Sequence, residues 1–243
     1  MISFLLLNQL NVGHEPTMWI KICGNTNLKD AQLAAELGAD ALGFIFAPSK
    51  RQVTAAEVAS ITPHLPQHIE RVGVFDSHNP DEIAAITRQA GLTAIQLHGG
   101  LDQSLVNRLH EIFEGKVNLI QTIHWTIDSP DSAATVAAQL EEIRSAAIVR
   151  RVLIDSKVGQ ASGGTGISFD WKAAGAVLAE SARGLSIIIA GGLRPENVAD
   201  AIHGLNPWGI DVSSGVEREP RSKDSGKLAA FIKNARHASQ PKS

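Results

Sequence analysis

Eight short apolar runs, each followed by a stretch with helical features, divide this chain. The runs read WIKIC, ALGFIF, RVGVF, AIQLH, VNLIQTI, RVLID, SIIIA and GIDVS, at residues 19–23, 41–46, 71–75, 94–98, 117–123, 151–155, 186–190 and 209–213. Each run has the length of a strand, and strands that alternate with helices pair in parallel through right-handed crossovers. Eight such units in 243 residues predict an α/β fold, a single closed (β/α)8 barrel of the TIM type.

Residues typical of helix starts lie between several of these runs. Asn27 or Thr26 can act as the N-cap of a helix after the first run, and Asn79 can do so after the third. Thr54 and Glu57 have the spacing of a capping box, in which each side chain binds the other residue's backbone N–H. These signals favour the alternation of strands and helices that a barrel requires.

The alternative fold is an open, doubly wound parallel sheet. Such a sheet would be expected to carry a Gly-x-Gly-x-x-Gly turn directly after its first strand, but residues 23–27 read CGNTN. No proline- or serine-rich linker divides the chain, so we predict one barrel domain over residues 18–237. Residues 1–17 are predicted to be an N-terminal extension that adds no strand to the barrel, and residues 238–243 a C-terminal tail.

Charge and cysteine content argue against several classes of protein. The formal net charge is −3, so the chain lacks the broad basic field that a nucleic acid would need. The single cysteine allows neither an internal disulfide nor a multi-cysteine zinc site, which fits a reducing compartment, and we predict a cytoplasmic protein. The apolar run Phe4–Leu7 is too short to span a bilayer and follows no basic segment. Neither membrane association nor a signal peptide is predicted.

Polar side chains recur on one face of the predicted strands. Successive strand residues point to opposite faces, and the apolar face of each strand must lie under the helices. The other face points into the barrel and carries Cys23, His98, Asp155, Asp211 and Ser213 near the C-terminal ends of the strands, where enzymes of this fold have their active sites. Singly, a cysteine is often a small buried apolar residue, and an aspartate is often a turn former. Their convergence predicts a site.

Two loops carry small residues that favour an anion. Gly191 and Gly192 follow the seventh run, and Ser213, Ser214 and Gly215 follow the eighth. Glycines let the backbone approach an anion closely, and the loops after strands seven and eight frequently bind phosphate in this fold. Paired glycines can also serve only to make a tight turn. Because the two loops support each other, we predict that these five residues bind phosphate.

Two further loops belong to the predicted mouth. APSKRQV, after the second run, offers Lys50 and Arg51, and Arg51 has the planar fork that binds carboxylates. Residues 157–171, after the sixth run, read KVGQASGGTGISFDW and are rich in glycine, which is typical of a lid over an active site.

Eight segments of the chain together resemble the motifs of the phosphoribosylanthranilate isomerase family. They are KICGNTN, GADALGFIFAPSKR, VGVF, IQLHG, LIDS, GGTGISFDW, AGGLRPENV and DVSSGVE. They occur in order from about residue 19 to residue 234. The resemblance implies the Amadori rearrangement of N-(5′-phosphoribosyl)anthranilate to 1-(2-carboxyphenylamino)-1-deoxyribulose 5-phosphate in tryptophan biosynthesis. It implies a phosphosugar substrate and neither a metal nor an organic cofactor, and it suggests neighbouring tryptophan-pathway enzymes as partners.

The resemblance also implies roles for individual residues. The cysteine of the KICG motif is the general base in the family, which points to Cys23, and the aspartate that ends strand six is the general acid, which points to Asp155. The arginine of the SKR motif lies near the anthranilate carboxylate, which points to Arg51. Among the other inward-facing residues, His98 and Asp211 are predicted to bind substrate. The glycine pair and the serines form the phosphate cradle.

The implied reaction needs both an acid and a base. Opening of the ribose ring needs a proton on the ring oxygen, and Asp155 requires a raised pKa to hold that proton near neutral pH. The resulting iminium makes the C2′ hydrogen acidic. The thiolate of Cys23 can remove it if the pKa of the thiol is lowered. Lys21, on the same inward face as Cys23, is expected to favour the thiolate.

Two alternative functions and one departure from the family remain. A related isomerase of the histidine pathway uses two aspartates, and Cys23 stands in place of the first. A catalytically silent phosphate-binding barrel is disfavoured because Cys23 and Asp155 are both present. After SSGVE the family commonly has proline-glycine before KD, whereas this chain has Arg221 at the glycine position.

Overall fold

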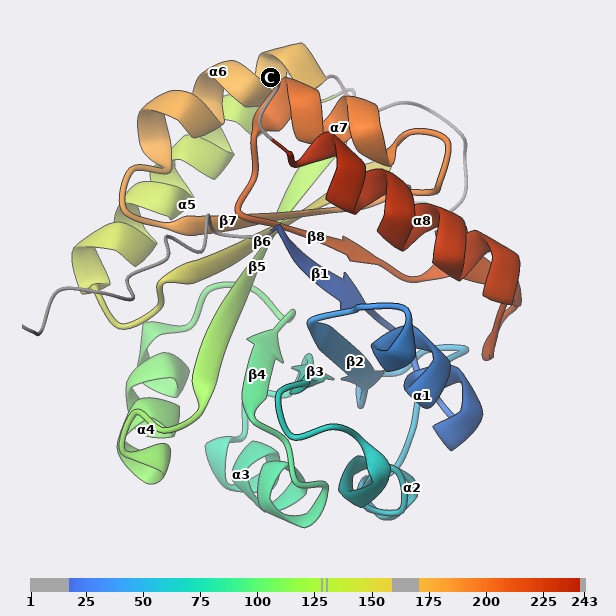
Figure 1. The fold of residues 1–243 in the computed structure, drawn as a ribbon. Helices are drawn as coiled ribbons and strands as arrows, with labels where there is room; N and C mark the ends of the chain where they lie inside the picture. Colours follow the sequence, from blue (N-terminus) through green and yellow to red (C-terminus); the bar gives the residue numbers. More distant parts are fainter. Residues whose placement is uncertain (1–17, 128, 130, 159–170, 241–243) are drawn as a thin grey trace, which may run out of the picture.

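Eight parallel strands close into a barrel, and the helices surround it (Figure 1). The computed structural model describes residues 18–127, 129, 131–158 and 171–240. The barrel strands are β1 (Trp19–Ile22), β2 (Ala41–Ile45), β3 (Glu70–Phe75), β4 (Ala94–Leu97), β5 (Asn118–Ile127), β6 (Arg151–Val158), β7 (Ser186–Ala190) and β8 (Gly209–Val212). β1 pairs with both β2 and β8, which closes the sheet. The predicted (β/α)8 barrel is confirmed, and the open sheet is excluded.

The helices are α1 (Leu28–Glu36), α2 (Ala55–Ala59), α3 (Pro80–Gln89), α4 (Gln103–Phe113), α5 (Ser132–Ala146), α6 (Trp171–Ser181), α7 (Val198–Leu205) and α8 (Ser225–Ala238), with short 3-10 turns η1 (Thr62–His64) and η2 (Ser214–Val216). Three of the helices, α1, α2 and α3, begin at the caps that the sequence predicts. Of the two candidate caps for α1, Asn27 is the one whose side chain accepts a backbone N–H. Thr54 and Glu57 form the predicted capping box, and Asn79 caps α3.

The barrel separates two apolar cores. The larger core lies between the strands and the helices and includes Ile20 and Ile154. The smaller core fills the barrel interior and consists of Trp19, Ala41, Val72, Ala94, Ile120, Leu153, Ile188 and Ala190. Neighbouring residues of β1 and of β6 therefore belong to different cores, which confirms the predicted assignment of faces.

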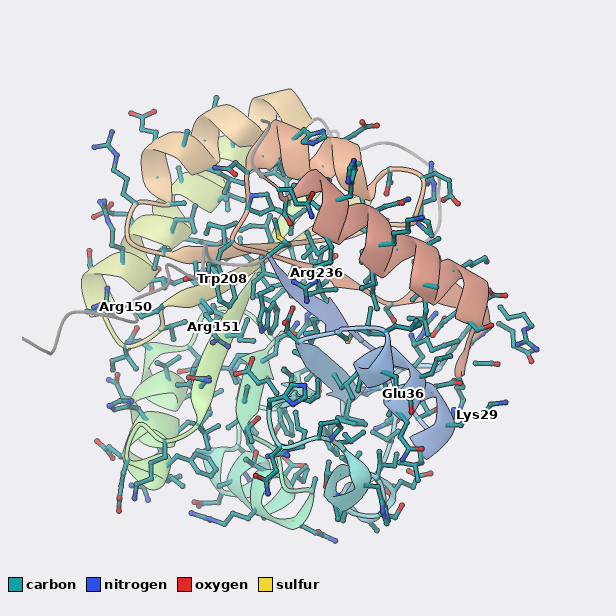
Figure 2. The ribbon with its side chains drawn as sticks, viewed as in Figure 1. Lys29, Glu36, Arg150, Arg151, Trp208 and Arg236 are labelled. Carbon is teal, nitrogen blue, oxygen red and sulfur yellow. The ribbon has the colours of Figure 1, made fainter. Side chains whose placement is uncertain are left out.

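The N-terminal end of the barrel interior is filled by aromatic rings and one ion pair. Trp19 stacks on Trp208 with a centroid distance of 5.3 Å, and the Arg151 guanidinium lies over the Trp208 ring, 4.8 Å from its centroid (Figure 2). Arg151 also donates to both carboxylate oxygens of Glu70, at 2.8 and 2.7 Å. Every polar group named here has a partner, so this end of the barrel is closed.

Three features near the opposite end of the barrel differ from the sequence prediction. The sixth strand continues to Val158, three residues beyond its predicted end at Asp155. The fifth strand continues to Ile127, four residues beyond its predicted end, which extends the inward face by His124. After β8, the strands β9 (Glu217–Glu219) and β10 (Ser222–Lys223) form an antiparallel hairpin that the sequence did not predict. Arg221, in the turn of this hairpin, has a φ of 76°, a left-handed conformation that favours glycine.

The ends of the chain are only partly described. Residues 1–17, the segment 159–170 within the predicted lid, and residues 241–243 lie outside the described residues. The predicted extension, lid and domain boundaries therefore stay predictions. None of the helices in the described part of the chain combines the length and the apolar composition that a bilayer crossing requires.

Candidate active site

Cys23 lies directly after β1, at the C-terminal end of the barrel. Its backbone N–H donates to the carbonyl of Val212 on β8 at 2.8 Å, and its side chain is buried. Gly43 on β2 provides the space for this side chain. A Cβ at Gly43 would lie 2.7 Å from the Cys23 sulfur and 2.9 Å from Cε of Lys21. The neighbouring strand is therefore fitted to the cysteine and to the lysine beside it.

Lys21 connects three strands inside the barrel. Its ammonium group donates to Oε1 of Gln96 at 2.9 Å and to Oδ1 of Asp211 at 3.1 Å. Gln96 in turn donates to the hydroxyl of Thr122 at 3.1 Å. Lys21 is fully buried, and an ammonium group at such a depth requires a paired charge and good hydrogen bonds. Asp211 therefore serves as the counter-ion of Lys21 below Cys23.

The electrostatic surroundings of Cys23 act in opposing directions. Burial has the largest effect and raises the pKa of the Cys23 thiol above its ordinary value, and the Asp211 carboxylate adds to this increase. The ammonium groups of Lys21 and Lys223 lower the pKa of the same thiol. The prediction that Lys21 favours the thiolate is confirmed in direction, but burial outweighs it. Net pKa lowering of the Cys23 thiol, which the sequence argument required, is absent from this structure.

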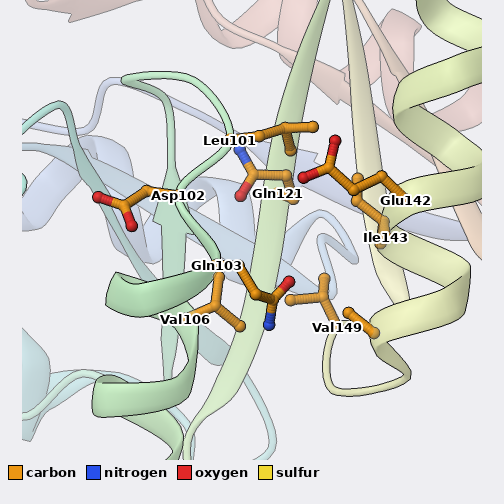
Figure 3. A pocket seen from close by; sticks show the side chains of 9 residues that line it. Leu101, Asp102, Gln103, Val106, Gln121, Glu142, Ile143 and Val149 are labelled. Atoms are coloured by element: carbon orange, nitrogen blue, oxygen red, sulfur yellow. The ribbon is translucent and has the colours of Figure 1, made fainter.

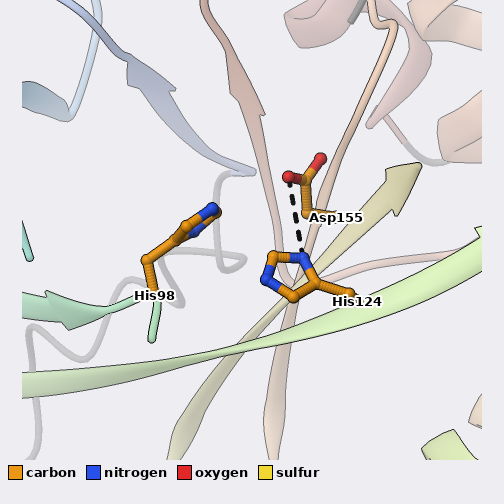
Figure 4. A group of neighbouring side chains, drawn as sticks. All are labelled: His98, His124 and Asp155. Atoms are coloured by element: carbon orange, nitrogen blue, oxygen red, sulfur yellow. Dashed lines mark ion pairs between the residues drawn. The ribbon is translucent and has the colours of Figure 1, made fainter. Parts of the chain in front are cut away.

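Asp155, in the C-terminal half of β6, faces two histidines (Figure 4). His124 of β5 is its register partner, and Nδ1 of His124 lies 4.0 Å from Oδ2 of Asp155. His98, the first residue after β4, packs edge-on against His124 with a ring-centroid distance of 4.7 Å. The side chains of His124 and Asp155 are 30% and 23% exposed, so this part of the mouth can be reached from solvent.

The guanidinium of Arg51 is bound by the carboxylate of Glu217, at the start of the β9–β10 hairpin. Its Nε lies 2.7 Å from Oε1 of Glu217, and its Nη2 lies 2.5 Å from Oε2 of the same carboxylate. Lys223 donates to the same Oε1 of Glu217 at 3.1 Å and also to the backbone carbonyls of Cys23 and Ser213, at 2.6 and 3.2 Å. The hairpin thus fixes Arg51 and the segments that follow β1 and β8 relative to one another.

The two predicted phosphate loops lie against each other. A Cβ at Gly215 would come within 1.9 Å of the carbonyl oxygen of Leu193, so the loop after β8 contacts the loop after β7. Gly191 and Gly192 have φ values of 89° and 64°. A Cβ at Gly191 would meet Ser156 of β6, whereas one at Gly192 would meet nothing within 4 Å. Gly192 therefore borders open space beside a close-packed junction of the two loops.

The hydroxyl of Ser213 is available at this junction. Its Oγ is buried and has no hydrogen-bond partner among the described residues. Gly24, with a φ of 75°, allows this approach, because a Cβ there would lie 2.9 Å from Oγ of Ser213 and 2.6 Å from Cδ of Arg51. A buried hydroxyl without a partner is costly, which favours a polar ligand at this position.

The sequence analysis missed several residues of the mouth. His124 lies beyond the predicted end of the fifth strand, although the alternation in QTIHWTI continues through it. Gln96 lies on a predicted inward face, but no sequence feature links it to Lys21. Glu217 and Lys223 contact residues more than 160 positions away along the chain, and local patterns carry no signal for such contacts.

A separate small pocket lies away from the mouth, between α4 and α5 (Figure 3). Leu101, Gln121 and Ile143 are among the side chains that line it. Its volume of about 10 Å³ suits a single water molecule. A phosphosugar does not fit there.

Comparison with known proteins gives one consistent family. The family model described as N-(5'phosphoribosyl)anthranilate (PRA) isomerase matches residues 20–234. The chain is 39% identical over 234 residues to N-(5'-phosphoribosyl)anthranilate isomerase of Symbiobacterium thermophilum, covering 90% of this chain and 98% of that protein.

Solved structures agree with this match. The phosphoribosyl anthranilate isomerase of Thermotoga maritima superposes with a TM-score of 0.77 at 34% identity, covering 90% of this chain and 99% of the other. A similar structure, with a TM-score of 0.73 at 32% identity and the same coverage, is a phosphoribosyl anthranilate isomerase in complex with reduced 1-(o-carboxyphenylamino)-1-deoxyribulose 5-phosphate.

Proposed function

The chain belongs to the N-(5'-phosphoribosyl)anthranilate isomerase family, and we propose that it performs the family's Amadori rearrangement with Cys23 as general base and Asp155 as general acid. As a member of this family it is an isomerase of tryptophan biosynthesis. The observation that carries the assignment of the two residues is their position. Both lie toward the C-terminal ends of barrel strands, Cys23 after β1 and Asp155 in β6, on faces that point inward.

The acid step takes place at the ribose ring. Asp155 donates its proton to the ring oxygen while the C1′–O bond breaks and the anilino nitrogen supplies the electron pair of the new C=N bond. The product of this step is an open-chain iminium with a hydroxyl at C4′. His124, 4.0 Å from the Asp155 carboxylate, is placed to orient it between protonations. A partly exposed carboxyl can also be reprotonated from solvent after each turnover.

The base step takes place at C2′. The iminium withdraws electrons from C2′, so the thiolate of Cys23 can remove the C2′ proton and leave an enolamine, which then becomes the ketone of the product. Because burial raises the pKa of the Cys23 thiol in the free protein, the reactive thiolate depends on the ammonium groups of Lys21 and Lys223. The cation formed by ring opening adds a further positive charge near the thiol and favours its ionisation in the complex.

Two groups at the mouth are proposed to hold the ends of the substrate. The loops with Gly191, Gly192, Ser213, Ser214 and Gly215 bind the 5′-phosphate; the contact between the two loops and the unpartnered Ser213 hydroxyl support this.

Arg51 binds the anthranilate carboxylate while Glu217 keeps the guanidinium in place. His98 is proposed to contact the sugar at the rim of the mouth, where it packs against His124. Asp211 is proposed to act on the site through its ion pair with Lys21.

The activity is tested by adding the purified protein to N-(5′-phosphoribosyl)anthranilate and following the loss of the substrate's fluorescence. Turnover with release of 1-(2-carboxyphenylamino)-1-deoxyribulose 5-phosphate supports the proposal. A protein that binds the substrate without converting it would be a silent phosphate-binding barrel. A protein that converts only the corresponding aminoaldose of the histidine pathway would instead be the histidine-pathway isomerase.

A cytoplasmic location and contacts with neighbouring tryptophan-pathway enzymes are also proposed. The location rests on the single cysteine, which fits a reducing compartment. The contacts rest only on the shared pathway. Cell fractionation tests the location, and cross-linking followed by mass spectrometry tests the contacts.

A further inference from the structure

Three potential metal ligands meet at the mouth on consecutive strands. His98 follows β4, His124 belongs to β5 and Asp155 belongs to β6. One ligand atom from each side chain lies within 4.8 Å of those from the other two (Figure 4). A tetrahedral zinc ion with bonds of about 2.0–2.1 Å holds its ligand atoms roughly 3.3 Å apart. The three side chains must therefore approach one another by at most about 1.5 Å, which changes in their side-chain torsion angles can supply.

The combination of ligands suits a borderline divalent cation. Two imidazoles and one carboxylate form the ligand set of many zinc sites that keep a fourth position open, and imidazole favours zinc over magnesium or calcium. We infer that His98, His124 and Asp155 form a binding site for a zinc-class divalent cation at the barrel mouth. Water would complete the four ligands of such an ion.

The surroundings favour this position over the nearby cysteine. Thiolates are strong zinc ligands, but Cys23 is buried. The ammonium group of Lys21, held beside it by hydrogen bonds to Gln96 and Asp211, would repel a second cation. His124 and Asp155 are instead partly exposed. The ion pair that a cation would have to displace there, between His124 and Asp155, is long at 4.0 Å and only partly buried.

Zinc at this position opposes catalysis. The cation takes the Asp155 carboxylate as a ligand, and a coordinated carboxylate cannot hold the proton that ring opening requires. Zinc binding is thus expected to inhibit the isomerase, and this consequence rests on the proposed function of Asp155. The binding itself does not depend on that function, because it requires only the three side chains.

Binding is measured on the untagged full chain by calorimetric titration with ZnCl2 and by the visible absorption of Co²⁺ as a spectroscopic substitute. The parent protein is expected to bind one ion. His124→Ala and His98→Ala are each expected to weaken binding roughly tenfold or more, since even outer-shell partners of a metal contribute that much. His64→Ala is the matched control, because His64 is exposed in η1, which precedes β3 and therefore lies at the opposite end of the barrel. That variant should bind like the parent.

Three outcomes overturn the site: a parent that binds no ion, a His124→Ala variant that binds as tightly as the parent, and binding that disappears in Cys23→Ser. The last result would make the thiolate the ligand. Inhibition is then measured as the ratio of turnover with and without ZnCl2 within each variant. If Zn²⁺ binds through the three residues but leaves turnover unchanged, the site stands and the acid role of Asp155 is wrong.

Discussion

The two ends of the barrel interior use the same strands for different purposes. Strand β6 contributes Arg151 to the N-terminal end and Asp155 to the C-terminal end, on the same inward face. Arg151 is bound by both oxygens of Glu70 and packs on tryptophan rings, so its hydrogen-bonding and charge requirements are met by the protein. At the mouth, Asp155 lies 4.0 Å from the imidazole of His124. Its side chain is 23% exposed, much like the 24% of Arg151, so the two ends differ in the type of partner and not in exposure.

This difference separates residues that stabilise the fold from residues that act on substrate. Arg151 and Glu70 bind each other, and neither is proposed to contact substrate. At the mouth, the buried Ser213 hydroxyl has no hydrogen-bond partner among the described residues. Distance along the strand, and not residue type alone, decides which role a side chain has.

The largest expected effect is at the mouth end of β6. Asp155→Asn keeps the shape of the side chain but removes its transferable proton, so kcat should fall by roughly 10²–10⁴, the usual contribution of a positioned acid. The free energy of unfolding should be unchanged within about 0.5 kcal/mol, since the site is partly exposed. Steady-state fluorescence assays and urea unfolding measure the two quantities. A loss of stability with near-normal kcat would remove the distinction between the two ends.

The other end of the same strand should respond in the opposite way. Arg151→Met leaves the Glu70 carboxylate without its partner and removes the contact with Trp208. We expect the free energy of unfolding to fall by about 1–3 kcal/mol, because the Glu70 carboxylate, which is only 12% exposed, loses its hydrogen-bond donor. The kcat of the folded variant should stay within about threefold of the parent, far from a lost acid or base. A kcat loss of two orders of magnitude in a stable Arg151→Met protein would contradict this account.

Two glycines give a matched pair for the phosphate site. Gly192 after β7 and Gly184 before β7 both have left-handed φ values, 64° and 80°, and a Cβ at either meets nothing within 4 Å. Gly192→Leu should raise KM about tenfold, equal to about 1.4 kcal/mol of binding, because the side chain enters the predicted phosphate space. Gly184→Leu carries the same backbone strain at the closed end and should leave KM unchanged. Equal KM values in the two variants would place the phosphate elsewhere, as would non-competitive inhibition by inorganic phosphate.

The smallest expected effect is in the hairpin beside the mouth. Arg221 has a φ of 76°, and its side chain donates to the carbonyl of Gln52 at 2.8 Å. Arg221→Gly relieves a left-handed strain of about 1–2 kcal/mol but loses this exposed hydrogen bond and gives the unfolded chain more freedom. The net gain in the free energy of unfolding should be about 0.5 kcal/mol, measured by urea unfolding. Destabilisation by more than about 1 kcal/mol would mean that the Gln52 contact outweighs the strain.

The sequence predicts the strands and helices of the barrel better than the side-chain contacts at its mouth. The eight strands, their faces and the capping box of Thr54 and Glu57 follow from local periodicity, so they could be predicted. The grouping of Cys23 and Asp155 at one mouth follows from strand alternation and parallel order.

The side-chain partners at the mouth could not be predicted. Glu217 binds Arg51 across 166 positions, and its hairpin is too short for a clear periodic signal. The raised pKa of the Cys23 thiol depends on burial, which only the folded structure provides.

The central claim is that Cys23, although buried like a core residue, acts as the base at the mouth. The most direct measurement is kcat of Cys23→Ser at full substrate saturation, with circular dichroism to verify the fold. A hydroxyl is nearly isosteric with a thiol, but its pKa is far too high for a base. The account therefore predicts a kcat roughly 10²–10⁴ lower in a folded protein. A kcat within about threefold of the parent would contradict it and return Cys23 to the class of small buried apolar residues.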